Sequence, residues 1–186
     1  MPRPQDDEIL VRVRAATVAG ADGRARRGSP FYGRVRSGLL RPRFPVLGSY
    51  FAGQVEGAGP AVSWFGVGDM VFGTVAPRFG AHAEYVCLPE HGAIAPMPAD
   101  VSYPEAAALA DATALCLLRD QAGLRPGQTV LVNGASGAVG AAAVQLAEKS
   151  ELAAVIGGRY PLEQIADAHA RVDAGQVKGE IVVTMA

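Results

Sequence analysis

Three glycines spaced three residues apart constrain this chain more than any other feature. Residues 133–140 read NGASGAVG, with glycines at 134, 137 and 140. The apolar run 129–132 before them predicts a short buried strand, and Ala138–Lys149 after them predicts a helix of good helix formers. Glycines at such a turn let the N–H groups of the first helical turn face a pyrophosphate, and let the helix pack on the strand. The turn therefore predicts a dinucleotide-binding strand and helix.

The first hundred residues predict β structure. Residues 8–15 alternate apolar and charged side chains, as a half-buried strand does. Residues 17–45 lack a sustained period and predict a long loop with a short helical piece. The glycine-rich segment 45–59 predicts a pair of short strands, and further strands are expected within 70–74 and 80–88. Short strands joined by glycine turns are typical of a barrel or a sandwich.

Helical patterns begin near residue 100. Ser102 and Glu105 have the spacing of a capping box, Pro104 suits the first turn, and an alanine-rich helix follows over 106–110. A second helix is predicted over 111–122, with Gly123 as its stop.

Composition and charge exclude several classes of protein. With 49% hydrophobic and 19% charged residues, the chain should bury a core. No apolar stretch reaches the ~18 residues of a membrane span, and the start has no signal-peptide pattern. Two cysteines, Cys87 and Cys116, are too few for a disulfide framework, which favours a reducing, cytoplasmic location. Residues 1–45 hold ten arginines and four acids, which we interpret as a solvated surface and not as a nucleic-acid site.

Six segments in order resemble a known family: EILVRVRAATV, RFPVLGSYFAGQVEGAG, WFGVGDMVFG, RFGAHAEYVCLPE, LRPGQTVLVNGASGAVGAAAVQLA and the C-terminal RYPLEQIADAHARVDAGQVKGEIVVTMA. Together they are similar to the medium-chain dehydrogenase/reductase superfamily, zinc-independent quinone oxidoreductase-like branch. The resemblance implies a mixed α/β, mainly β chain: a GroES-like barrel for the substrate and a Rossmann domain for the cofactor. It also implies reduction of a small-molecule quinone or α,β-unsaturated carbonyl by hydride from NADPH.

The resemblance also implies which residues form the site. Asp22 matches a family aspartate, and Tyr32 falls where enoyl reductase relatives have a tyrosine donor, so both are catalytic candidates; the alternative for Tyr32 is a loop aromatic that covers the barrel. Tyr50 replaces a family aspartate and is a substrate candidate. The cofactor is expected on Thr113, Gly134, Ser136, Gly137, Val139 and Gly140.

Zinc is not expected. Zinc-dependent relatives carry Gly-His-Glu where this chain has Gly48, Ser49 and Tyr50, and their four-cysteine site has no counterpart. Catalytic zinc needs three protein ligands of His, Cys or carboxylate type. His82, Cys87 and His91 are expected to be packing and surface residues.

The chain is too short to contain a complete Rossmann domain as well as the barrel. Only 46 of the 186 residues follow Gly140, although a doubly wound domain needs over a hundred more. We therefore expect residues 1–125 plus 151–186 to form the barrel domain, completed by 162–184, and 126–150 to remain as a truncated Rossmann stub. Ile156, Leu162, Ile165, Ala166 and Val172 are expected to bury against the barrel. Cofactor binding should be weak, and the strand that selects NADH or NADPH is missing.

Two functions from different classes stay open. One is a shortened quinone or enone reductase. The other is a non-catalytic GroES-like module that keeps the fold and an oligomerisation role, for which the exposed edge of the lone strand predicts a homodimer.

Overall fold

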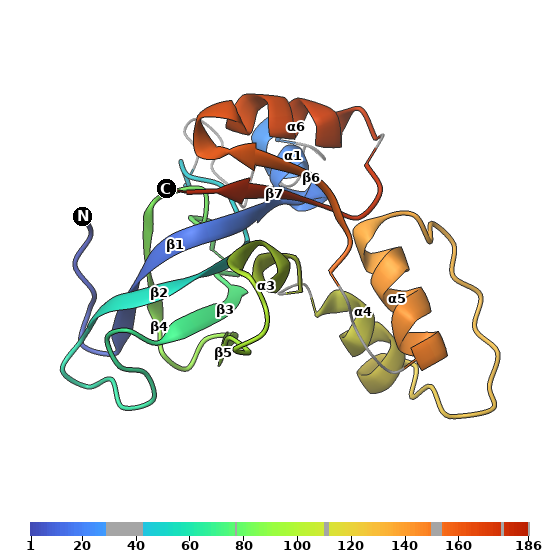
Figure 1. The fold of residues 1–186 in the computed structure, drawn as a ribbon, viewed down its shortest axis with the longest axis horizontal. Helices are drawn as coiled ribbons and strands as arrows, with labels where there is room; N and C mark the ends of the chain where they lie inside the picture. Colours follow the sequence, from blue (N-terminus) through green and yellow to red (C-terminus); the bar gives the residue numbers. More distant parts are fainter. Residues whose placement is uncertain (29–42, 77, 110–111, 150–153, 176, 186) are drawn as a thin grey trace.

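The computed structural model describes residues 1–28, 43–76, 78–109, 112–149, 154–175 and 177–185. Figure 1 shows two regions: a sheet with α1 and α6 along one side of it, and a helical end formed by α4 and α5. The short helix α3, Tyr103–Leu109, lies between them against the sheet.

One sheet joins strands from both ends of the chain. Its order is β5-β3-β2-β1-β7-β6, and β4 also pairs with β1. All pairings are antiparallel except that of β6 with β7. The strands are β1 Glu8–Val18, β2 Tyr50–Ala58, β3 Met70–Thr74, β4 Tyr85–Pro89, β5 Ile94–Pro96, β6 Ile156–Pro161 and β7 Glu180–Thr184.

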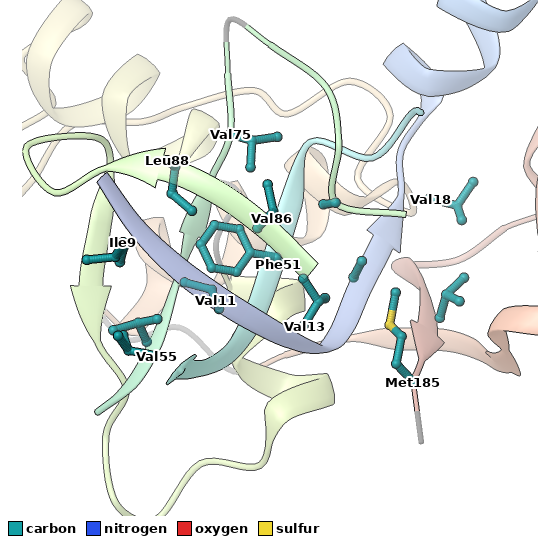
Figure 2. Close-up of a cluster of buried hydrophobic side chains, with 14 of the residues drawn as sticks. Ile9, Val11, Val13, Val18, Phe51, Val55, Val75, Val86, Leu88 and Met185 are labelled. Atoms are coloured by element: carbon teal, nitrogen blue, oxygen red, sulfur yellow. The ribbon is translucent and has the colours of Figure 1, made fainter. Parts of the chain in front are cut away.

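The core centres on β1. Its apolar residues Ile9, Val11 and Val13 are at most 1% exposed and gather around Phe51 of β2, which is fully buried (Figure 2). Arg12 and Arg14 between them are half-buried, as the predicted alternation requires. Burial of these side chains supplies most of the driving force for folding this region.

The segment 45–59 forms a single strand, so the expected pair of short strands is wrong. Gly53 lies inside β2 and does not interrupt it. A Cβ at this position would lie 2.2 Å from the carbonyl oxygen of Arg12 on the neighbouring strand. The glycine marks a close backbone approach inside the sheet. The strand predicted within 80–88 is also shorter than its pattern, since β4 begins at Tyr85.

The helices after residue 100 follow the predicted caps only in part. The Ser102 N–H donates to Glu105 Oε2 (3.0 Å), which confirms that side of the capping box at α3. In place of one helix over 111–122 the chain forms α4, Thr113–Leu115, and a π-helical turn η1, Cys116–Gln121. Gly123, at φ +58°, follows the end of this turn as predicted.

The C-terminal segment returns to the sheet. After β6 come the 3₁₀ turn η2, Leu162–Gln164, and α6, Ile165–Asp173; then β7 pairs antiparallel with β1 from Ala15 to Val18. The predicted C-terminal helix and last strand are confirmed, whereas β6 was not predicted. Four of the five residues expected to bury, Ile156, Leu162, Ile165 and Val172, are partly buried against the core, but Ala166 is exposed. Ala166 faces outward because Ala168 and His169 occupy the buried face of α6.

The strand predicted at 129–132 is absent: these described residues make no ladder, and Leu131 is 95% exposed. A buried parallel strand needs neighbours on both edges and helices on both faces, and these residues have neither. The predicted helix after the turn is confirmed as α5, Ala138–Lys149. None of the helices in the described ranges is long and apolar enough to cross a membrane.

Candidate functional site

A backbone hydrogen bond closes the glycine turn, which comprises residues 133–140. The Gly137 N–H donates to the Gly134 carbonyl oxygen (3.0 Å), and Gly134 has φ +79°, which L side chains rarely adopt. A Cβ at Gly140 would lie 2.2 Å from the same carbonyl oxygen, whereas a Cβ at Gly137 would meet it at an ordinary 3.5 Å. Gly134 and Gly140 are therefore required by the turn, and Gly137 leaves its backbone open.

The turn docks on the start of β7. Gly137 forms a parallel bridge with Gly179, whose N–H donates to the Ser136 carbonyl oxygen (3.2 Å). The C-terminal strand thus provides a contact for the turn. The first turn of α5 begins here, and its N–H groups have no partner within the helix.

A cleft of about 870 Å³ runs between the sheet and the glycine turn. Its volume falls in the range of about 300–1,000 Å³ that ligand pockets occupy. The sheet side contributes Val18–Ala21 and Tyr50, and the opposite wall comes from α4, η1, residues 130–134 and α5. The floor includes Val177 and Gly179–Ile181 at the start of β7.

Most residues predicted from the sequence to contact cofactor or substrate line this cleft: Tyr50, Thr113, Gly134, Gly137, Val139 and Gly140. Ser136 instead uses its carbonyl group to hold Gly179. Tyr32 lies outside the described residues. The cleft also contains residues that the sequence reasoning missed, among them Arg24, Asn133 and Glu180. The contact between β7 and the glycine turn joins residues about 40 apart in sequence, so spacing alone could not predict it. The only sequence signal for this part of the cleft is the hydrophobic character of β7.

Asp22 lies beneath the cleft wall and not in it. Its carboxylate is fully buried and accepts hydrogen bonds from the N–H groups of Ala19 (2.8 Å) and Gly48 (3.2 Å) and from the Ser49 hydroxyl (3.4 Å). The carboxylate at N3 caps the N-terminus of α1, Gly20–Arg27, and ties it to the loop before β2. The Asp22 carboxylate therefore links Ala19 to the loop that precedes Tyr50.

A second cavity of about 650 Å³ adjoins the cleft. It shares Tyr50, Thr113 and Leu117 with the cleft, so these side chains stand between the two spaces. No charged residue lines it within the described ranges; its walls include Phe72, Ile94, Leu109 and Leu115. An apolar cavity of this kind takes an uncharged ring or chain.

Two histidine rings, the half-buried His82 and the buried His169, lie against each other. The His82 and His169 rings meet edge to face at 5.4 Å between centroids, and His82 Nε2 bonds to the Thr17 carbonyl oxygen (2.8 Å). Burial, with a smaller effect from His82, lowers the pKa of His169 below its ordinary value. Among the described residues His169 Nδ1 has no hydrogen-bond partner, so the neutral ring is the favoured form.

The segment Gly48 to Tyr50, which the zinc expectation concerns, contains no histidine, cysteine or carboxylate. Ser49 and Tyr50 stand where histidine and glutamate would be ligands, and the Ser49 hydroxyl bonds to Asp22. Of the residues that the structure describes, no three His, Cys, Asp or Glu side chains gather closely enough to hold a metal ion. His91 packs against Trp64, with ring centroids 4.3 Å apart.

Comparisons with known proteins agree with this geometry. The model of the alcohol dehydrogenase GroES-like domain matches residues 5–99, and that of the zinc-binding dehydrogenases matches residues 59–183. The quinone oxidoreductase of Lama guanicoe is 35% identical over 150 residues, 79% of this chain and 42% of that protein. The spectinabilin polyketide synthase system protein NorB of Streptomyces orinoci is 48% identical over 104 residues, 55% of this chain and 5% of that protein.

A solved structure shares the arrangement. The quinone oxidoreductase of Pseudomonas syringae pv. tomato DC3000 superposes with a TM-score of 0.66 at 34% identity, covering 91% of this chain and 50% of that one. The chain spans less than half the length of the curated relatives it matches. The two family models, which together match residues 5–183, and the quinone oxidoreductase relatives give one conclusion. The chain belongs to the medium-chain dehydrogenase/reductase superfamily, in its quinone oxidoreductase-like branch.

Proposed function

We propose that this chain binds a nicotinamide dinucleotide in the cleft and acts as an oxidoreductase on a quinone or an α,β-unsaturated carbonyl compound. One observation carries the proposal: six of the seven residues that the sequence assigns to cofactor and substrate converge on one cleft of ligand size, all except Ser136. The named quinone oxidoreductase relatives support the same reaction class.

Each wall has a role in this proposal. The first turn of α5 directs its N–H groups and the positive end of its helix dipole at the pyrophosphate, and Gly137 lets that group approach the backbone. Thr113 contacts the nicotinamide end, and Tyr50 holds the substrate where the cleft meets the apolar cavity. When bound, the nicotinamide ring supplies a hydride to the substrate; the protein contributes binding, orientation and exclusion of water.

Further parts of the proposal rest on the resemblance and on the residues present. We propose NADPH as the cofactor, bound weakly, no requirement for zinc, and Tyr32 as the proton donor. Asp22 acts by positioning Ala19 and the loop before β2. The barrel domain comprises 1–125 and 151–186, and 126–150 is the Rossmann remnant. Two free thiols, Cys87 and Cys116, favour the cytoplasm.

NADPH titration followed by cofactor fluorescence tests the proposal. We expect saturable binding with a dissociation constant below about 100 μM. Gly137→Ala should weaken it roughly tenfold, because the added methyl group fits the turn but stands where the pyrophosphate approaches. Gly66→Ala, in an exposed turn where an added Cβ would lie at an ordinary 3.9 Å from Asp69 Oδ2, is the matched control and should bind as the native chain does. No binding at millimolar NADPH would refute the proposal.

The second candidate is a non-catalytic module that dimerises. It is favoured by one observation: residues 129–132 join none of the described strands, and Leu131 is 95% exposed, which leaves this segment accessible to a second copy. Light scattering at micromolar concentrations distinguishes the two candidates. A dimer that Leu131→Pro converts to a monomer, together with no NADPH binding, would support the module, whereas a monomer that binds NADPH would reject it.

A further inference from the structure

The last turn of α1 carries three arginines with two different environments. Arg26 and Arg27 both pair with the carboxylate of Asp173 at the end of α6. The two helices approach closely there, since a Cβ at Gly23 would lie 2.8 Å from Asp173 Oδ1. These two guanidinium groups thus serve the contact between α1 and α6.

Arg24 has another environment. It lines the 870 Å³ cleft, and its Nη1 atom lies 3.7 Å from where a Cβ of Gly20 would be, so the side chain folds back over the N-terminal end of α1. It makes no ion pair with any residue in the described part of the chain, and the residue is exposed. Asp22, the nearest acid in sequence, is fully buried and already bonded to Ala19, Gly48 and Ser49.

Charges are scarce along this cleft. Among its described lining residues Arg24 is the one cation, and Glu180 the one anion; Glu180 is 7% exposed at the start of β7. The rest of the wall is glycine, alanine, valine, leucine and a few neutral polar side chains. A guanidinium group that lines an otherwise apolar cleft offers paired N–H donors to a carboxylate or phosphate, and such charge-assisted hydrogen bonds are stronger than those between neutral groups.

We propose that Arg24 is the residue that makes this cleft selective for an anionic ligand, through paired N–H donors to a carboxylate or phosphate oxygen. This inference rests on the proposed function for the cleft and names the chemical class of its ligand. The anion has two sources, a phosphate group of the dinucleotide or a carboxylate on the carbonyl substrate. Both present the planar or multidentate acceptor that arginine recognises.

Calorimetric titrations of the full chain with two ligand pairs test the proposal. The first pair is NADPH and NADH, which differ by the 2′-phosphate; the second is anthraquinone-2-carboxylate and its uncharged carboxamide. We expect Arg24→Gln to raise the dissociation constant of at least one anionic ligand about tenfold or more. Arg24→Lys should recover part of the lost affinity. Arg26→Gln, which removes the same charge from the α1–α6 contact, should change each dissociation constant less than twofold.

The pattern of losses identifies the source. If Arg24→Gln loses affinity for NADPH alone, Arg24 binds the 2′-phosphate. If it loses affinity equally for both dinucleotides, Arg24 binds the pyrophosphate. If it loses affinity for anthraquinone-2-carboxylate alone, Arg24 binds the substrate. If neither dinucleotide binds but the carboxylate binds through Arg24, the proposed cofactor function fails and this inference stands. Arg24→Gln binding all four ligands as the native chain does, or no binding of any of them to the native chain, overturns it.

Discussion

The sheet and the helical end of this molecule differ in how they bury their apolar residues. In the sheet, β1 buries Ile9 and Val11 completely, and strands from both ends of the chain pair with it. In the helical end, the apolar run before α5 leaves Leu131 95% exposed and Val130 37% exposed. Both segments have strand-like sequences, so the difference lies in the neighbours available to them. A strand pattern becomes a strand only where other strands pair with its edges.

The same comparison explains why the cleft lies where it does. On the sheet side, the buried Asp22 bonds to Ala19 and to the loop that precedes Tyr50, and both Ala19 and Tyr50 line the cleft. The other side is held by the bridge between Gly137 and Gly179 and by packing of α4 on α5. Ligand binding is expected to order this second wall, because its few buried contacts leave it the less stable of the two.

The largest expected effect contrasts one core residue with one exposed residue. Phe51→Ala should reduce the free energy of unfolding by about 3–5 kcal/mol, because it opens a cavity at the centre of the core. Leu131→Ala removes an apolar side chain of the helical end and should change it by less than about 0.5 kcal/mol. Urea denaturation measures both. A comparable loss from Leu131→Ala would mean that residues 129–132 are packed after all.

A smaller effect is expected at the support of the cleft wall. Asp22→Asn should cost about 1.5–3 kcal/mol, since an amide cannot accept all three hydrogen bonds of the buried carboxylate. Asp69→Asn removes a carboxylate that accepts only the Gly66 N–H in an exposed turn, and is the matched control. Urea denaturation again gives the comparison, and equal effects of the two substitutions would contradict a supporting role for Asp22.

The ion pairs between α1 and α6 are expected to contribute less. Asp173→Asn breaks the contacts to Arg26 and Arg27, which lie at the surface, and should cost about 0.5–1 kcal/mol at low ionic strength. The cost should shrink as salt is added, because salt screens exposed charges. Thermal unfolding at two salt concentrations checks this. A salt-independent loss would indicate packing and not charge as the cause.

The smallest effect concerns the pH dependence of stability. Burial lowers the pKa of His169, so the unfolded chain takes up a proton at a higher pH than the folded chain does. Stability from this group is therefore complete above its ordinary value near 6.5 and declines as pH falls through that value toward the folded pKa. The groups that face it are His82, Asp22, Arg26 and Asp173.

Replacing His169 isolates its contribution to that slope. His169→Gln should flatten the fall in unfolding free energy between pH 7.5 and about pH 5. His91→Gln, at an exposed ring beside Trp64, should leave the slope unchanged. Identical slopes in the native chain and His169→Gln would show that the ring is not held neutral.

Local patterns predicted the elements that local physics decides. The helix after the glycine turn, the strand Met70–Thr74, the side-chain cap before α3 and the final strand all follow from spacing and caps within a few residues. The prediction fails at 129–132, where an apolar run has no partner strand, and at β6, whose Gly-Gly-Arg sequence has no strand pattern but pairs with β7.

The glycine residues of the site could be predicted from the sequence, but the residues that the rest of the fold brings to the cleft could not. The spacing of Gly134, Gly137 and Gly140 predicts a tight turn by itself, and two of the three glycines have a local reason: Gly134 has φ +79°, and a Cβ at Gly140 would lie 2.2 Å from the Gly134 carbonyl oxygen. Arg24 and Glu180 could not be found this way. They reach the cleft only because α1 packs on α6 and β7 pairs with β1, and both contacts join distant parts of the chain.

Hydrogen–deuterium exchange of the full chain with and without NADPH tests the central claim most directly, since it reports where the dinucleotide binds. The account predicts slower exchange at residues 130–140 and at the start of β7, with little change in the already protected β1. Unchanged exchange at Gly134–Gly140 with NADPH bound, or protection confined to other parts of the chain, would contradict a cofactor site at the glycine turn.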